Sequence, residues 1–196
     1  MDLPVYFVAP PTGHAAYYFA AGRNDMLVID DRNGSPKDIK TLIHAARKHG
    51  ADVILADFER PPSPAAKEIL SELAKQFRTA APAEYGGDGV EPIFCYDPSK
   101  ECFSEFKTRL PEKCWLELRP VDKTVIYPAK LSAPAEERGD FFSGELQCRY
   151  CLTQRVDGYV LHLYDTPETM HKRLERLASG LYGAVGLQNE LTEYGF

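Results

Sequence analysis

Short apolar runs alternate with longer amphipathic stretches along most of this chain. The runs at residues 5–9, 26–31 and 51–59 are short and mostly apolar, and the first and third are bounded by Gly or Pro, which is the pattern of buried strands. Between them, apolar residues recur at helical spacing, as in Ile39, Leu42 and Ala46. The alternation therefore predicts strands connected by helices.

Eight such strands are predicted, at residues 5–9, 26–31, 51–59, 78–85, 92–96, 114–120, 159–164 and 184–187. Four pairs of a capping residue and Pro are expected to begin helices: Ser35-Pro36, Ser63-Pro64, Asp97-Pro98 and Thr166-Pro167. A further short helix is expected around residues 15–18. Repeated strand–helix units predict an α/β fold with a parallel sheet, as a small or degenerate (β/α)8 TIM-like barrel. An open doubly wound sheet is the alternative, but the chain has no glycine-rich nucleotide-binding motif after any strand.

The strand–helix rhythm stops between residues 121 and 158. Residues 124–127 and 145–152 have the pattern of antiparallel strands around a polar loop that contains Pro and Gly. We therefore expect one barrel-like domain over residues 1–196, with residues 121–158 as a β-hairpin insertion. Such an insertion can form the wall of a groove or meet another subunit, so a homo-oligomer through this hairpin is expected.

Charge and composition exclude several classes of protein. The chain has 196 residues and a net charge of −6, which argues against nucleic-acid and anionic-membrane surfaces, because both are bound by basic patches. No apolar run approaches membrane-spanning length, and the first residues lack the pattern of a signal peptide. The five cysteines are an odd number, typical of reduced thiols. A cytoplasmic location and no cofactor are expected.

The candidate chemistry lies at the end of the third predicted strand. Alternation places Leu55, Asp57 and Glu59 on one face of that strand. Two carboxylates at the C-terminal end of a buried strand are where α/β folds place their catalytic groups. Their like charges favour one protonated carboxyl group, which can act as a proton donor near neutral pH. The alternative is that both are solvated residues at a strand end.

Other reactive residues show weaker patterns. Cys148 and Cys151 are three residues apart on a predicted strand, so they face opposite sides and do not form a metal or redox pair. The five histidines have no ligand spacing, and His162 is interpreted as a core or rim histidine. The acids at strand ends are expected to be helix caps or, as a weaker alternative, ligands of a divalent metal; they are Asp30, Asp31, Asp97 and Asp165. No metal site is predicted.

The sequence from Asp52 to Pro61 resembles the D-G-x-D-x-D-x-E signature of chitinase-like family-18 glycoside hydrolases. Asp52, Asp57 and Glu59 match its first Asp, last Asp and Glu, whereas Val53 replaces the Gly and Leu55 the middle Asp. Residues 163–172 and 183–187 are similar to the family's penultimate strand with its helix and to its closing strand. Gln188 stands where that strand usually ends in a Trp that forms the floor of the sugar site.

The resemblance implies a divergent, shortened barrel and assigns roles to the two carboxylates. Glu59 would be the general acid, and Asp57 would hold the 2-acetamido group of an N-acetylglucosamine unit, whose carbonyl oxygen attacks the anomeric carbon. Glu117 and Arg119 share a strand face with Trp115 and are expected to form an ion pair with Asp57 or Glu59. The expected substrate-binding residues are Asp31, Tyr96, Glu117, Arg119, Tyr164 and Gln188. A catalytically inactive barrel that binds a glycan or a partner protein is the alternative.

Overall fold

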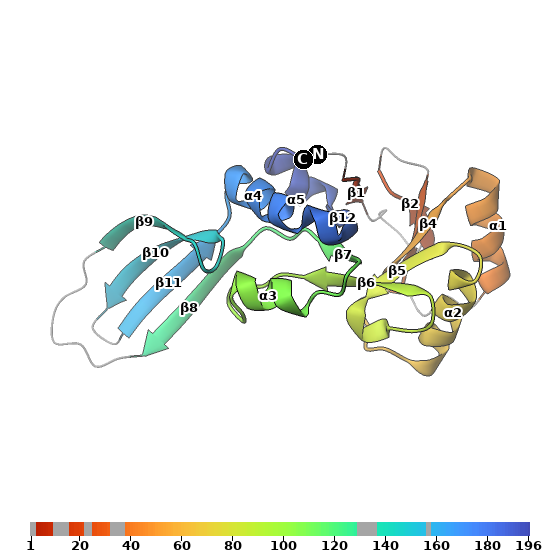
Figure 1. Cartoon of the computed structure of the whole chain (residues 1–196), viewed down its shortest axis with the longest axis horizontal. Coiled ribbons are helices and arrows are strands. Elements are labelled where there is room, and N and C mark those ends of the chain that lie inside the picture. The colour runs from red at the N-terminus through yellow and green to blue at the C-terminus, as the bar shows by residue number, and fades with distance from the viewer. Residues whose placement is uncertain (1–2, 10–15, 22–24, 32–37, 129–136, 156–157) are drawn as a thin grey trace.

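The computed structural model describes residues 3–9, 16–21, 25–31, 38–128, 137–155 and 158–196. They form two β-sheets, one of eight strands and one of four (Figure 1). The strands are β1 (Val5–Val8), β2 (Tyr17–Phe19), β3 (Met26–Asp30), β4 (Val53–Asp57), β5 (Arg78–Pro82), β6 (Val90–Cys95), β7 (Cys114–Glu117), β8 (Asp122–Pro128), β9 (Glu137–Ser143), β10 (Cys148–Arg155), β11 (Gly158–Tyr164) and β12 (Leu181–Leu187). The α-helices are α1 (Ile39–His49), α2 (Pro64–Ala74), α3 (Phe103–Arg109), α4 (Pro167–Leu177) and α5 (Gln188–Glu193), with short 3₁₀ turns at Ala83–Tyr85 and Ala178–Gly180.

The larger sheet is curled and mostly parallel. Its order is β1-β12-β7-β6-β5-β4-β3-β2, and only β2 runs antiparallel to its neighbour. The two edges of the sheet approach each other where the backbone N–H of Ala21 donates to the carbonyl of Phe7 at 2.8 Å. A mixed α/β fold with a curled, barrel-like sheet is thus present.

The arrangement differs from a regular (β/α)8 barrel in two respects. The predicted barrel strand at residues 159–164 is β11, which pairs within the four-stranded sheet instead. The predicted helix around residues 15–18 is wrong, because Tyr17–Phe19 forms strand β2. This segment is aromatic, and aromatic side chains favour strands where they pack on a half-buried sheet.

Both faces of the curled sheet are covered, which explains its nearly continuous apolar strands. In β4, Val53 and Leu55 belong to the interior cluster with Trp115, while Ile54 and Ala56 belong to the cluster under α1 and α2. This alternation confirms that Leu55 and Asp57 share the interior face. A third cluster packs α3, α4 and α5 against the outer face of the β1–β12–β7 side.

The helix starts follow capping chemistry, though not always at the predicted residue. Ser63 and Thr166 cap α2 and α4, each followed by Pro, as predicted. Ser35-Pro36 lies outside the described residues, and Asp38 caps α1. Asp97-Pro98 does not begin a helix; α3 begins five residues later, after Cys102. The backbone N–H of Cys102 donates to the side chain of Glu105 in the first turn of that helix.

The N-terminal end of the curled sheet is filled by a network around Trp115. The indole N–H of Trp115 donates to Glu91 at 2.6 Å, and the guanidinium of Arg78 donates to the same carboxylate at 3.1 Å. The guanidinium carbon of Arg78 also lies 4.8 Å from the ring centroid of Tyr182. A Cβ on Gly183 would come within 2.5 Å of the Trp115 ring, so this site requires Gly. The interior is therefore packed at this end.

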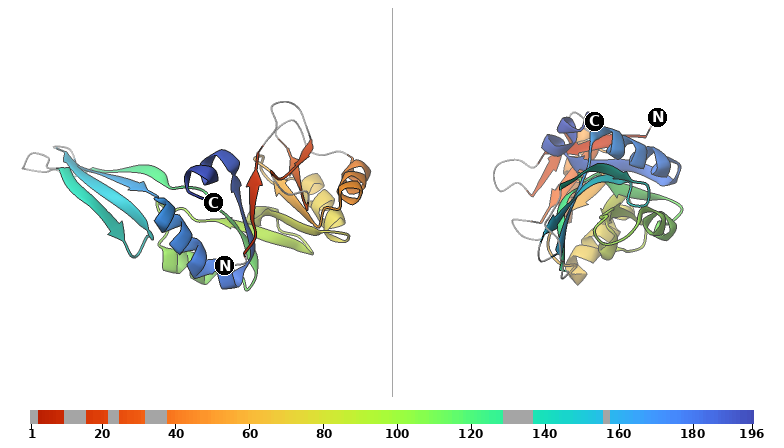
Figure 2. Two further views of the ribbon diagram at one scale, coloured as in Figure 1. Left: turned by 90° about the horizontal axis from the view of Figure 1, so that it is seen from above. Right: turned by 90° about the vertical axis from the view of Figure 1, so that its left-hand side faces the viewer.

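The four-stranded antiparallel sheet projects from one side of the larger unit (Figures 1 and 2). Its order is β8-β11-β10-β9, so the strand that enters the sheet, β8, pairs directly with the strand that leaves it, β11. It extends from Asp122 to Tyr164 and thus includes residues beyond the predicted insertion at 121–158.

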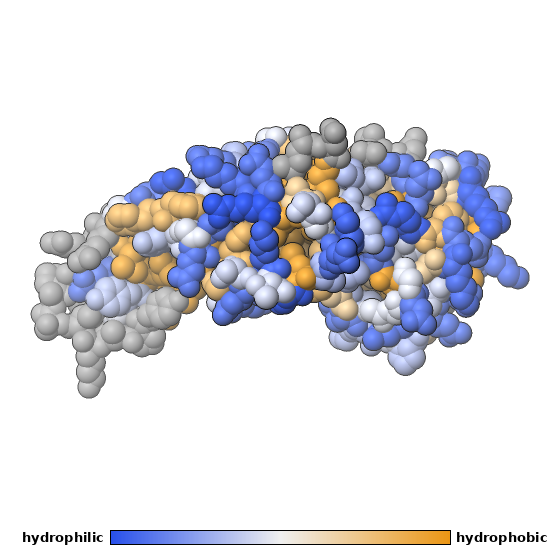
Figure 3. All heavy atoms as spheres, in the orientation of Figure 1, coloured by the Kyte–Doolittle hydropathy of each residue, from blue (hydrophilic) through white to orange (hydrophobic). Residues whose placement is uncertain are grey.

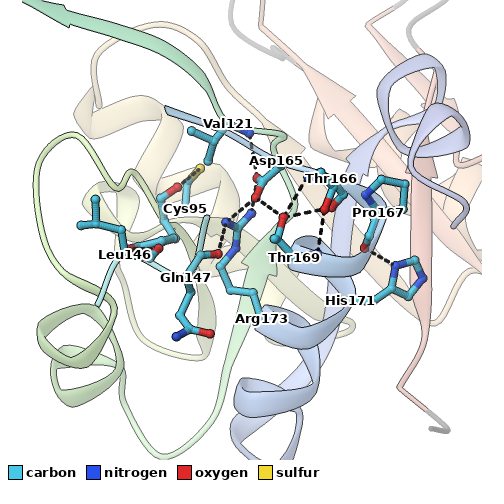
Figure 4. A network of polar contacts seen from close by, with 11 residues as sticks. Cys95, Val121, Leu146, Gln147, Asp165, Thr166, Pro167, Thr169, His171 and Arg173 are labelled. Carbon is cyan, nitrogen blue, oxygen red and sulfur yellow. Dashed lines mark hydrogen bonds and ion pairs between the residues drawn. The ribbon is translucent and has the colours of Figure 1, made fainter. Parts of the chain in front are cut away.

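A buried ion pair ties this sheet to the helix that follows it. Arg173 of α4 donates to Asp165 at 2.6 and 3.0 Å, with side-chain exposures of 6% and 0%. Asp165 also accepts the backbone N–H of Val121 and the hydroxyl of Thr169, as Figure 4 shows. The same carboxylate therefore fixes the segment that enters the sheet and the segment that leaves it.

No helix among the described residues is both long enough and apolar enough to cross a membrane.

Candidate functional site

Asp57 lies at the C-terminal end of β4, on the interior face of the curled sheet. Its Cα pairs with that of Asp30 on β3, so the two carboxylates share this face at the same edge. The phenol of Tyr18 donates to Asp57 Oδ2 at 3.3 Å. Asp57 is half-buried, and it is the last residue of β4.

Glu59 lies two residues beyond the end of β4, and its side chain is exposed. Its backbone N–H donates to Asp31 Oδ1 at 2.9 Å, and that of Arg60 donates to Asp31 Oδ2 at 3.2 Å. Asp31 is itself buried, with 4% exposure. A buried carboxylate thus holds the backbone of this loop, while the side chain of Glu59 is exposed to solvent.

Tyr85 supports the same loop from the other side. Its hydroxyl donates to the carbonyl oxygen of Arg60, and its ring packs edge-on against Phe58 with centroids 5.2 Å apart. Burial, and after it the negative charge of Asp31, raises the pKa of Tyr85, so the phenol stays a donor at neutral pH. Neither Tyr18 nor Tyr85 is predicted from the sequence as a residue that supports the site. The aromatic run around Tyr18 was a signal for a strand, whereas Tyr85 gave none.

The ends of β6 and β7 contribute a second polar group at this edge. Cys95 and Glu117 pair in register, and Glu117 accepts a hydrogen bond from Arg119. Burial, and after it the charge of Glu117, raises the pKa of Cys95 to about 12, so this thiol remains protonated and unreactive. Arg119, which follows the end of β7, therefore pairs with the last residue of that strand, Glu117. Convergence of Glu117 with Asp57 and Glu59 in one pocket stays a prediction.

The remaining predicted substrate-binding residues lie in different environments. Gln188 begins α5 and lines an open depression of about 680 Å³ together with Val8 and Thr192. Tyr96 is buried on the outer face, where its hydroxyl donates to the carbonyl of Leu146 at 2.8 Å. Tyr164 ends β11 in the four-stranded sheet. Asp31, Asp57, Glu59, Glu117 and Arg119 thus lie at or just beyond the C-terminal ends of β3, β4 and β7, and Gln188 follows the end of β12.

The strand-end acids are occupied by structural partners. Asp97 accepts hydrogen bonds from the backbone N–H and hydroxyl of Ser99, and Asp165 pairs with Arg173. Within the described ranges, no group of three or more His, Cys, Asp or Glu is arranged to hold a metal ion.

The curled sheet gives the chain a divergent fold that is similar to those of solved spore cortex-lytic enzyme and GH18 chitinase structures. No protein-family model matches the sequence, and no curated protein matches it.

Among the similar structures is the spore cortex-lytic enzyme SleL of Bacillus cereus, with a TM-score of 0.50 and 12% identity over 86% of this chain and 57% of that one. SleL of Bacillus megaterium QM B1551 gives a TM-score of 0.46 and 11% identity over 82% and 55%. A GH18 chitinase of Cycas revoluta, in complex with (GlcNAc)3, gives a TM-score of 0.46 and 13% identity over 81% and 74%. The chain thus spans little more than half the length of the two SleL enzymes.

Proposed function

We propose that this chain is a glycoside hydrolase that acts on glycans containing N-acetylglucosamine by a retaining, substrate-assisted mechanism. The observation that carries the proposal is the placement of Asp57 and Glu59 at the C-terminal end of β4, with the backbone of Glu59 held by Asp31. The similarity of the fold to that of the spore cortex-lytic enzyme SleL of Bacillus cereus supports it.

In this mechanism, Glu59 is the general acid. Its carboxyl group protonates the leaving glycosidic oxygen, while the carbonyl oxygen of the substrate's 2-acetamido group attacks the anomeric carbon. Asp57 holds that acetamido group, and the phenol of Tyr18 donates a hydrogen bond to Oδ2 of this carboxylate. Water then opens the cyclic intermediate with Glu59 acting as the base, which gives retention of configuration.

The alternative is a catalytically inactive barrel that binds a glycan or a partner protein. Leu55 favours it, because this residue stands where the family signature has its middle Asp and is buried in the interior with 2% exposure. An acidic neighbour of Asp57 is thereby replaced by an apolar side chain. Gln188 also offers a sugar ring less stacking area than the indole usual at this position.

Calorimetry and turnover with the same ligand separate the two functions. The ligand is a chromogenic N-acetylglucosamine oligomer, added to the whole chain. Turnover supports the hydrolase, and binding without turnover supports the inactive glycan-binding barrel. The absence of both binding and turnover would contradict a glycan function.

We also propose a cytoplasmic location and a homo-oligomer formed through the four-stranded sheet. The first is supported by the five cysteines, none of which is in a disulfide. The second is supported by exposed apolar side chains on this sheet, since Ile126, Phe141 and Phe142 are 66%, 45% and 47% exposed. Sedimentation equilibrium tests the oligomer, and a monomer at every concentration would contradict it.

A further inference from the structure

Three polar residues meet on one face of the four-stranded sheet, outside the candidate glycan site. Cys151 of β10 lies directly opposite His162 of β11, and its Sγ is 3.9 Å from His162 Nδ1. His162 Nε2 is 2.7 Å from Oδ1 of Asp122 on β8. Three strands thus place a thiol, an imidazole and a carboxylate in line.

The contact with Asp122 decides which nitrogen of His162 carries its proton. An ionised carboxylate only accepts hydrogen bonds, so Nε2 is the donor in this contact. In the neutral imidazole, Nδ1 is then the unprotonated nitrogen, and it faces the thiol of Cys151. The imidazole can take the thiol proton, and Asp122 stabilises the imidazolium that results.

The neighbouring charges are compatible with a thiolate at this place. Asp140 of β9 is opposite Cys151, but the guanidinium of Arg149 donates to it at 2.8–3.1 Å and compensates its charge. The ring of Tyr164 stacks on His162 with centroids 5.4 Å apart and restricts its orientation. The residue opposite His162 on β8 is Thr124, which is uncharged.

The backbone beside Cys151 is also irregular. The register between β9 and β10 shifts at Cys151, because Gly139 is an extra residue between the partners of Cys151 and Leu152. Such β-bulges occur preferentially where a strand redirects a functional side chain. A Cβ on Gly139 would meet no atom within 4 Å, so the space beside the bulge is open.

The other cysteine of the same strand has a contrasting environment. Cys148 is fully buried, and burial, followed by the charge of Asp165, raises its pKa to about 11. It lies at the joint with the larger unit, whereas Cys151 is only partly buried. Of these two thiols, only Cys151 has a base beside it.

We propose that Cys151, His162 and Asp122 form a nucleophilic thiol site that reacts with hydroperoxides. The thiolate sulfur attacks one oxygen of the peroxide, the S–O bond forms and the O–O bond breaks. The imidazolium of His162 gives its proton to the departing oxygen, which leaves as water when the reactant is hydrogen peroxide. Cys151 is oxidised to a sulfenic acid and the peroxide is reduced. A small reactant suits a thiol on an open sheet face.

The experiment uses the whole, reduced chain with limiting hydrogen peroxide and dimedone, which traps sulfenic acids. Peptide mass spectrometry then gives the fraction of adduct at each cysteine. Cys102 is the internal reference, because it is also partly buried but its Sγ is 3.1 Å from the hydroxyl of Ser104 rather than beside an imidazole. We expect the adduct at Cys151 to exceed that at Cys102 by about three- to tenfold at pH 7, because the imidazole of His162 can accept the thiol proton as the sulfur attacks.

Variants distinguish a built site from simple exposure. His162→Gln should lower the adduct at Cys151 to the level of Cys102, and Asp122→Asn, at a side chain with 83% exposure, should lower it in part without affecting folding. Cys102→Ser should leave the adduct at Cys151 unchanged. Labelling of Cys151 at or below the level of Cys102, or unchanged labelling in both His162→Gln and Asp122→Asn, would overturn the proposal.

Discussion

The Oδ1 atom of Asp31 lies 2.9 Å from the backbone nitrogen of Glu59 and accepts its hydrogen bond. Asp31 follows β3 and Glu59 follows β4, so the contact joins the ends of two neighbouring parallel strands. A buried carboxylate thereby fixes the backbone that presents the proposed general acid. Asp31 was predicted to bind substrate, but in the structure its two oxygens hold this loop.

Replacing Asp31 tests the importance of this contact. Asp31→Asn turns one acceptor into an N–H₂ group that faces a backbone N–H, so one hydrogen bond is lost at a buried position. We expect the free energy of unfolding to fall by about 1–3 kcal/mol, measured by urea denaturation. Asp52→Asn is the matched control, because Asp52 is exposed at the opposite end of β4, and its effect should stay within about 0.5 kcal/mol. Equal effects would contradict a special role for Asp31.

The joint between the two sheets is predicted to depend on Asp165. Asp165→Ala leaves the guanidinium of Arg173 and the N–H of Val121 buried without their acceptor, so we expect a loss of about 3–5 kcal/mol in the free energy of unfolding. Asp140→Ala is the matched control. It removes an ion pair with Arg149 whose side chains are 50% and 31% exposed, and such pairs contribute about 0–1 kcal/mol. A loss for Asp165→Ala no larger than for the control would show that the buried pair does not stabilise the joint.

Cys95 gives a prediction about alkaline pH. Its pKa is raised in the folded chain from 9.0 to about 12, so the folded state keeps a proton that the unfolded state has lost. The stabilisation is complete below about pH 9 and is lost as the pH rises towards 12. The free energy of unfolding should therefore fall with pH in this window more steeply for the wild type than for Cys95→Ala. Denaturant titrations at several pH values measure the difference, with Cys102→Ala as control. Parallel curves for wild type and Cys95→Ala would contradict the assignment.

The apolar pattern was sufficient to predict the parallel strands, because buried strands are short and uniformly apolar. It also predicted the interior position of Leu55 and Asp57 and the caps at Ser63 and Thr166. For residues 159–164, the pattern predicted a strand but assigned it to the wrong sheet, because apolar residues indicate a strand and do not indicate its neighbours. Sheet membership depends on contacts with β8 and β10, which a local pattern does not contain.

The contacts that support the site could not be predicted from the sequence, because they join residues that are far apart along the chain. Asp31 is 28 residues from Glu59 and Tyr85 is 25 residues from Arg60, so no spacing rule connects them. The pairing of Cys151 with His162 follows from the antiparallel register of β10 and β11, which places these two residues opposite each other on one face.

Replacing Glu59, the proposed general acid, tests the proposed function most directly. The measurement is the rate of release of the chromophore from an N-acetylglucosamine oligomer by the wild type, Glu59→Gln and Glu68→Gln, with binding measured by calorimetry. Glu68 is exposed on α2, so its substitution controls for the loss of a surface charge. We predict turnover by the wild type and by Glu68→Gln, and a loss of about 10²–10⁴-fold in Glu59→Gln with binding retained. Equal turnover in Glu59→Gln and Glu68→Gln would contradict the claim.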